Sequence, residues 1–163
     1  MMSAQPKTNN IIVLGIGNIL FQDEGVGVHA IEAFRHKQAN YPEVNIEDGG
    51  TEGMKLLPLI EETTHLIIVD AVAAQGEAGE LICLEKEEIP YFPGARLSQH
   101  QQSFQELLFL ADFRGHLPEN IYFIGIVPGA IEWGTAMTPE ALGAIPQVVE
   151  KIEDRLKKWG AAV

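Results

Sequence analysis

Short apolar runs alternate along the chain with amphipathic segments, and most of the runs end in glycine or a polar residue. Runs of this length are typical of strands that are buried on both faces of a sheet. We therefore predict five strands, at residues 11–14, 44–47, 65–69, 81–84 and 121–127. Apolar positions spaced three and four residues apart predict helices in the segments between these strands. The first helix is expected to end near residue 38, and the second to begin at Thr51. Two further helices are expected over residues 104–110 and 139–159.

The connection before the fourth predicted strand is unusually short. Ten residues separate Asp70 from Leu81, and they include Gly76 and Gly79. A parallel crossover needs a dozen or more residues, so this strand is expected to run antiparallel to the one before it. The alternation of strands and helices otherwise predicts a three-layer α/β/α domain with a mostly parallel sheet.

The length and composition indicate one globular domain over residues 1–163, with residues 1–10 as a flexible polar N-terminus. The chain is 46% hydrophobic and 21% charged, close to the average for such domains. Cys83 is the single cysteine, which is typical of a reducing compartment. We see no signal peptide or membrane-spanning segment and expect a cytoplasmic protein.

The charge balance excludes some partners. The formal net charge is −12, whereas proteins that bind nucleic acid neutralise phosphates with Lys and Arg. We therefore expect no nucleic-acid partner. An acidic chain can still attract a cation or a metal centre.

Three candidate ligands lie on predicted loops or strand ends. Asp70 ends a buried strand, where an ionised carboxylate needs a partner or a cation. Glu24 follows the first strand, and both strand ends meet at one crevice if the two strands are neighbours. With His100, these residues make a mixed nitrogen and oxygen set that suits a divalent first-row ion. The alternatives are that Asp23 and Glu24 cap a helix and that His100 is a solvated cap.

Other chemistries lack support in the sequence. A dinucleotide fingerprint needs a third glycine where this chain has Leu20, so Gly15 and Gly17 are better interpreted as a tight turn. There is no phosphate-binding Gly-Lys-Ser/Thr loop and no Gly-x-Ser-x-Gly turn. We interpret Cys83 as a core thiol, not as a nucleophile.

An ordered set of motifs resembles the hydrogenase maturation endopeptidases, which trim the C-terminal extension from the large subunit of nickel-iron hydrogenases. The resemblance spans nearly the whole chain. The motifs are GIGNIL at 15–20, DEGVGV at 23–28, DGGT at 48–51, IIVDA at 67–71 and GIVP at 125–128. The segments HQQSF at 100–104 and ADFRGHLP at 111–118 further resemble the branch that serves uptake hydrogenases.

The resemblance implies a fold, an activity and a set of site residues. The fold is a phosphorylase/hydrolase-like mixed sheet of five strands, mostly parallel with one antiparallel. The implied metal contacts are Glu24, Asp70 and His100. The metal would be nickel supplied by the substrate, with no tightly bound cofactor of the protein's own. Asp23 and Asp48 are further catalytic candidates, for which stabilisation of a turn or cap is the alternative.

The implied partner is the immature large subunit, which a monomer would cleave after nickel is installed. Such an enzyme is an aspartyl-type or metal-dependent endopeptidase. The competing interpretation is a nickel chaperone or sensor that uses the same ligands without breaking a bond. A nucleotide-dependent α/β enzyme is a third interpretation, which Leu20 disfavours.

Overall fold

The computed structural model describes residues 8–91, 97 and 104–162, and a five-stranded sheet in the order β2-β1-β3-β5-β4 forms its centre. The strands are β1 (Ile11–Ile16), β2 (Val44–Gly50), β3 (His65–Ala71), β4 (Leu81–Glu85) and β5 (Asn120–Ile126). All neighbouring strands are parallel except β4, which is antiparallel to β5. The prediction of a mostly parallel sheet with one antiparallel strand is therefore confirmed.

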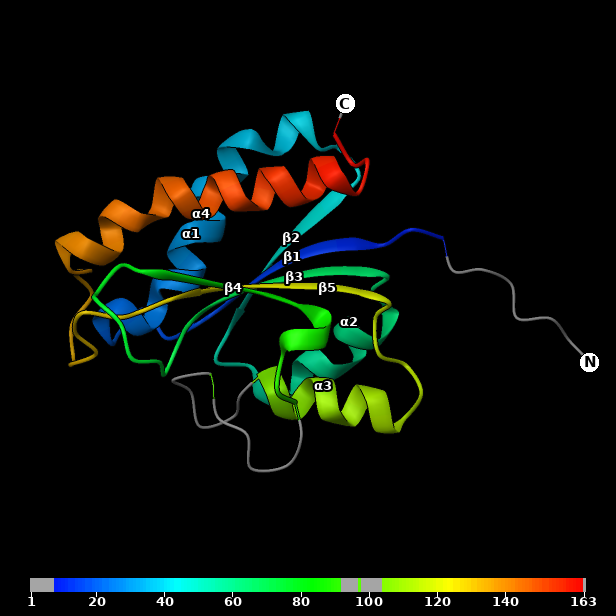
Figure 1. Cartoon of the computed structure of the whole chain (residues 1–163), viewed down its shortest axis with the longest axis horizontal. Coiled ribbons are helices and arrows are strands. Elements are labelled where there is room, and N and C mark those ends of the chain that lie inside the picture. Colours follow the sequence, from blue (N-terminus) through cyan, green and yellow to red (C-terminus); the bar gives the residue numbers. More distant parts are fainter. Residues whose placement is uncertain (1–7, 92–96, 98–103, 163) are drawn as a thin grey trace, which may run out of the picture.

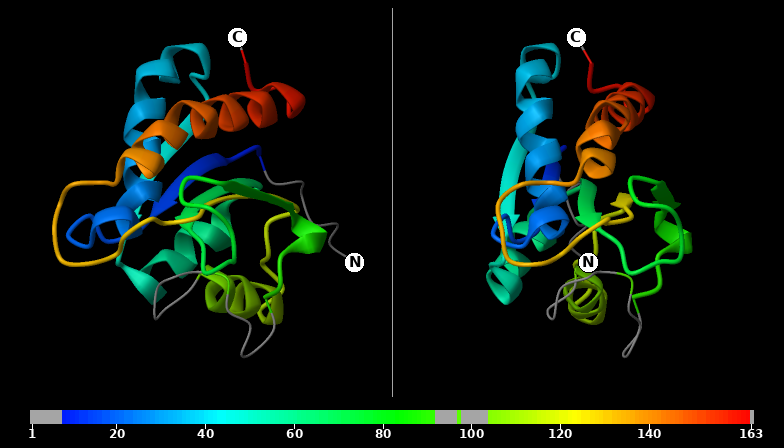
Figure 2. Two further views of the ribbon diagram at one scale, coloured as in Figure 1. Left: turned by 60° about the vertical axis from the view of Figure 1, so that its left-hand side comes forward. Right: turned by 90° about the vertical axis from the view of Figure 1, so that its left-hand side faces the viewer.

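Helices cover both faces of the sheet and complete the three predicted layers (Figure 1). On one face lie α1 (Val26–Phe34) and α4 (Pro139–Lys158), and on the other lie α2 (Leu57–Glu62) and α3 (Phe104–Phe113). The two turned views show the same division (Figure 2). Short 3-10 helices join these elements: η1 (Gln22–Gly25), η2 (Arg35–Asn40), η3 (Gly53–Leu56) and η4 (Lys86–Glu88).

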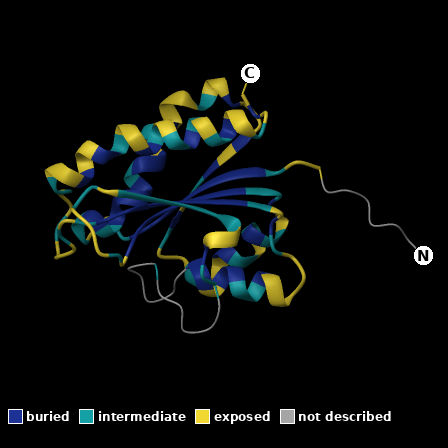
Figure 3. Cartoon of the chain, viewed as in Figure 1, coloured by how far each residue is buried: buried dark blue, intermediate teal, exposed yellow. Residues whose placement is uncertain are grey.

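The central strands are apolar throughout because they face a core on each side. In β1, Ile11 and Val13 belong to the core under α1 and α4. Ile12 and Leu14 alternate with them and belong to the core over α2 and α3. Successive side chains of a strand point to opposite faces, so a strand between two helical layers needs an apolar residue at every position. Figure 3 shows these strands buried along their length.

Two predicted boundaries are wrong in an informative way. The second strand was expected to end at residue 47, but β2 continues to Gly50 because Asp48 and Gly50 still pair with β1. The strand ends at Gly50, whose φ of +44° is readily adopted by glycine. The next helix accordingly begins as η3 at Gly53, and Thr51 is not its cap. Pro58 lies in the first turn of α2, where its missing N–H is tolerated.

The first helix is also shorter than predicted. Its α-helical part ends at Phe34, and the chain continues as η2 to Asn40. The residues of η2 are half-buried or exposed, so no apolar face continues the helix against the sheet. In the part of the chain that is described, no helix is long and apolar enough to cross a membrane.

An ion pair fastens the closing helix to the edge strand of the sheet. The Arg155 guanidinium on α4 donates hydrogen bonds of 2.8 and 2.5 Å to the two carboxylate oxygens of Glu85 on β4. These hydrogen bonds lower the pKa of Glu85. Arg155 also lies 3.9 Å from the ring centroid of Tyr122 on β5. The pair therefore helps to hold the antiparallel edge of the sheet under α4.

Candidate active site

The four parallel strands end at one edge of the sheet, and the candidate residues that the structure describes lie in segments at or next to these strand ends. This carboxyl edge lies at the left of Figure 1, where η1 follows β1 and the 127–138 loop follows β5. Ligand sites of open α/β sheets are found at this edge, where the connections from neighbouring strands leave a crevice. The expectation that β1 and β3 are neighbours is confirmed.

Glycine allows η1 and α1 to approach the strand ends closely. A Cβ atom at Gly27 would lie 2.3 Å from the Val69 carbonyl oxygen and 2.5 Å from that of Ile16. Gly17 has a φ of +153°, and a Cβ there would lie 2.3 Å from the Glu24 carbonyl oxygen. Every one of these contacts is to backbone, which cannot swing away. The glycines therefore place the backbone of Glu24 directly beside the ends of β1 and β3.

Asp70 is the second-last residue of β3. The strand continues two residues beyond the predicted end at residue 69, to Ala71, and Asp70 pairs with Gly125 of β5. The Asp70 side chain is fully buried, and its Oδ1 accepts a 2.8 Å hydrogen bond from the Ala71 N–H. Because η1 packs against β3, the structure brings the segments of Glu24 and Asp70 together.

The third predicted ligand, His100, lies outside the described residues. Two described residues that flank the segment 98–103 contact the sheet or the chain that follows it. Leu97 accepts a 2.6 Å hydrogen bond from the N–H of Ala73, which follows β3. Phe104, the first residue of α3, stacks on Phe123 of β5 with 4.7 Å between ring centroids. Across residues 8–91, 97 and 104–162, no group of three His, Cys, Asp or Glu residues is placed to hold a metal ion.

The Gln105 side chain holds the backbone near the start of α3, a role that the sequence did not indicate. It is buried in α3, its Oε1 accepts a 2.5 Å hydrogen bond from the Leu97 N–H, and its amide donates to the Pro90 carbonyl oxygen. One side chain thus fixes the backbone at two positions of the chain that precedes α3. The sequence alone does not reveal such a role, because it does not show which groups a polar residue on the inner face of a helix is bonded to.

Asp23 is fully buried and its carboxylate is saturated with hydrogen bonds. Oδ1 accepts from the Thr138 N–H at 2.8 Å, and Oδ2 accepts from the Thr138 hydroxyl at 2.6 Å. The Gly129 and Ala130 N–H groups donate to Oδ2 at 2.7 and 3.2 Å. Each oxygen is thus engaged by the 127–138 loop. The geometry favours the structural alternative for Asp23, which fastens this loop beside Glu24.

Thr138, the main partner of Asp23, is a second residue that the sequence interpretation missed. Its hydroxyl also accepts a 3.3 Å hydrogen bond from the Ala141 N–H and so caps α4. The signal was available, because a threonine followed by proline and glutamate is a typical helix start. The sequence does not show that the same hydroxyl is bonded to a carboxylate 115 residues away.

Asp48 lies at the carboxyl end of β2, at the same edge. Its side chain is exposed, and Oδ1 accepts a 2.9 Å hydrogen bond from the Gly50 N–H. An aspartate that bonds to the backbone two residues on is a common turn-stabilising arrangement. The Gly50 carbonyl in turn accepts from the Gly17 N–H at 3.0 Å. Asp48 thus supports the join between the ends of β1 and β2.

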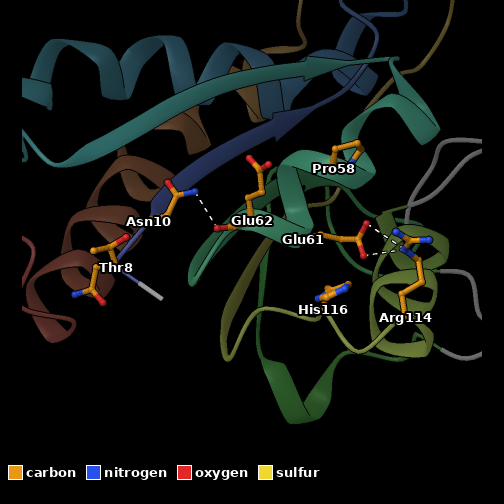
Figure 4. A pocket seen from close by; sticks show the side chains of 8 residues that line it. Thr8, Asn10, Pro58, Glu61, Glu62, Arg114 and His116 are labelled. Atoms are coloured by element: carbon orange, nitrogen blue, oxygen red, sulfur yellow. Dashed lines mark hydrogen bonds and ion pairs between the residues drawn. The ribbon is translucent and has the colours of Figure 1, made fainter. Parts of the chain in front are cut away.

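An open hollow of about 770 Å³ lies at the opposite, amino edge of the sheet. Figure 4 shows its lining residues, among them Asn10 before β1, Glu61 on α2, and Arg114 and His116 after α3. The Arg114 Nε donates hydrogen bonds of 2.9 and 3.2 Å to the Glu61 carboxylate. No candidate residue from the sequence lies in this hollow, so it is separate from the candidate site.

The comparisons with known proteins agree with this arrangement. The family model for hydrogenase maturation protease matches residues 28–155. Hydrogenase expression/formation protein HupD of Rhizobium leguminosarum bv. viciae is 44% identical over 160 residues, covering 97% of this chain and 79% of the relative. The hydrogenase 2 maturation protease of Escherichia coli (strain K12) is 34% identical over 151 residues, covering 92% of each chain.

A solved structure extends the likeness to three dimensions. The hydrogenase maturating endopeptidase HybD from E. coli matches with a TM-score of 0.82 and 34% identity, over 93% of this chain and 94% of that chain. The fold, the family model and the two similar relatives point to the same group of peptidases. The chain therefore belongs to the hydrogenase maturation protease family.

Proposed function

We propose that this peptidase removes the C-terminal extension from the nickel-loaded precursor of a nickel-iron hydrogenase large subunit. The observation that carries the proposal is the close packing of the η1 segment, with Glu24, onto the end of β3, with Asp70, in a member of this family. The E. coli relative is a hydrogenase 2 maturation protease, which supports a hydrogenase precursor as the substrate.

The chemistry of the two carboxylates fits a metal that arrives with the substrate. Asp70 is fully buried at the strand end, and an ionised carboxylate in such a place is stabilised when a cation binds beside it. Glu24, Asp70 and His100 form a nitrogen and oxygen ligand set of the type that binds divalent first-row metals. In this proposal they contact the nickel of the precursor and thereby fix the neighbouring peptide bond in the crevice.

Hydrolysis then adds one water across that bond. The body of the subunit gains a carboxylate, and the released tail gains an amino terminus. Positioning the bond against the site lowers the barrier by avoiding the loss of orientational freedom during the reaction. The attacking water must give up a proton, and carboxylates such as those of Glu24 and Asp70 are suitable acceptors.

The chain's composition supports one proposed setting for the reaction. Cys83 is its lone cysteine, and a single free thiol is compatible with a reducing compartment. We place the reaction in the cytoplasm, with the immature large subunit as partner and one copy of this chain as the enzyme. In this proposal the enzyme keeps no cofactor of its own between turnovers.

Mass spectrometry of the precursor tests the activity. We expect incubation of nickel-loaded precursor with the purified protein to produce two species whose masses sum to the precursor plus one water. The smaller species should be a single C-terminal fragment. A nickel chaperone or sensor would leave the precursor mass unchanged, and that outcome would reject the peptidase assignment. Precursor incubated without the protein is the control.

A further inference from the structure

Exposed apolar side chains are concentrated at the carboxyl edge. Within the described part of the chain, seven large hydrophobic side chains are between 42% and 82% exposed. Five of the seven lie in segments that follow β1, β2 or β5: Ile19, Leu20, Met54, Ile131 and Trp133. Exposed apolar groups that gather on one side of a protein, and do not scatter singly, are typical of an interaction surface.

Four of these side chains belong to two loops that are bonded to each other. We call Ile19, Leu20, Ile131 and Trp133 the two-loop surface. The Gly134 N–H donates to the Leu20 carbonyl at 2.8 Å, and the Gln22 N–H donates to the Gly134 carbonyl at 2.8 Å. This parallel bridge joins the segment after β1 to the segment after β5. The two pairs of exposed apolar residues therefore lie on segments that are fixed next to each other.

Side chains reinforce the junction between the loops. The Gln22 Oε1 accepts a hydrogen bond from the Glu132 N–H at 3.2 Å. Asp23, the next residue, accepts four more hydrogen bonds from the loop that follows β5. Gln22 has a φ of +50° and is the single non-glycine residue with positive φ in the described chain. Backbone strain of this kind persists where the surroundings enforce it, and it is frequent near functional sites.

Trp133 is the most prominent member of the surface. It is 74% exposed although its ring packs edge-on against Phe21, with 5.3 Å between centroids and 84° between planes. The loops therefore hold a large indole ring in a fixed place where most of it faces water. A rigid, exposed tryptophan loses little conformational entropy on binding, and tryptophan is enriched among the residues that dominate protein interfaces.

We propose that the two-loop surface binds an apolar segment of the protein substrate next to the bond that is cut. The inference rests on the proposed function, because it takes the occupant to be the precursor. Continuity with the candidate site supports this occupant: Glu24 follows Gln22 and Asp23 directly, so a chain bound at Glu24 passes over the same loops. The net charge of −12 repels acidic partners, and apolar contact supplies attraction that does not depend on charge.

Cleavage kinetics of the full-length protein test the surface. We expect Trp133→Ala to lower kcat/KM for the precursor at least tenfold, mainly through a higher KM, because binding is lost and the chemistry is not. Leu20→Ser should act in the same direction, and Trp133→Phe should restore part of the loss. The matched control is Phe113→Ala, which removes an exposed aromatic ring on α3 and should leave kcat/KM within twofold of wild type. Thermal unfolding shows that each variant is folded.

The outcomes separate this inference from the proposed function. If wild type fails to cleave the precursor, the proposed function is rejected before any variant is measured. If wild type cleaves and both Trp133→Ala and Leu20→Ser match it within twofold, the surface does not bind substrate. The other occupant to consider is a second copy of the chain. A wild-type dimer in sedimentation that Trp133→Ala dissociates, with cleavage unchanged, would also overturn the inference.

Discussion

Asp70→Asn should reduce the rate of precursor cleavage by at least about 100-fold, the range found when a group that acts on a proton or a metal in the reaction is lost. The asparagine keeps the size of the side chain, and its Oδ1 can still accept the hydrogen bond that the Ala71 N–H donates. The substitution removes the negative charge from a fully buried position at the end of β3. The expected loss of activity therefore comes from the missing charge and not from a change in side-chain size.

Single-turnover cleavage of nickel-loaded precursor measures this effect. Asp154→Asn, on the exposed surface of α4, is the matched control and should cleave at the wild-type rate. Circular dichroism and thermal unfolding establish that both proteins are folded. Cleavage by Asp70→Asn within threefold of wild type would show that this carboxylate takes no part in the reaction.

Asp23→Asn should destabilise the protein by about 2–4 kcal/mol, because buried hydrogen bonds to a charged group are lost and donors are left unsatisfied. The two Asp23 oxygens accept from three backbone N–H groups and the Thr138 hydroxyl. An asparagine has a single accepting oxygen, and its NH₂ group would face backbone N–H donors. The 127–138 loop should therefore lose part of its attachment to η1.

Urea unfolding compares this variant with Asp48→Asn. Asp48 is exposed and its Oδ1 accepts from the Gly50 N–H, a role that an asparagine oxygen fills equally well. We expect Asp48→Asn to change the free energy of unfolding by less than about 0.5 kcal/mol. Equal free energies of unfolding for the two variants would contradict the role assigned to Asp23.

The sequence predicted those parts of the fold that depend on local pattern. Buried strands need an apolar residue at each position, so β1, β3 and β5 were visible as continuous runs. The antiparallel direction of β4 followed from the length of one connection. The predicted end of β2 was wrong because Asp48 and Gly49 favour turns locally, while the pairing of Asp48 and Gly50 with β1 continues the strand. Local preference was overridden by a neighbouring strand.

The sequence indicated which segments lie together at the carboxyl edge, but not the contacts that they make. Strand ends indicated the edge where the segments of Glu24 and Asp70 come together, because parallel strands share a carboxyl edge. The saturation of Asp23 by Gly129 and Thr138 depends on contacts more than 100 residues apart along the chain, which no pattern in the sequence reveals. The roles of Gln105 and Trp133 likewise depend on what packs beside them. His100 remains a prediction, because it lies outside the described residues.

The dependence of cleavage on the substrate's nickel tests the central claim most directly. Nickel-loaded and nickel-free precursor are incubated with the wild-type protein under the same conditions, and the C-terminal fragment is quantified by mass spectrometry. If Glu24, Asp70 and His100 act by contacting the nickel, the fragment should form from the loaded precursor, and the nickel-free precursor should stay intact. Equal rates of fragment formation from both precursors would contradict the account.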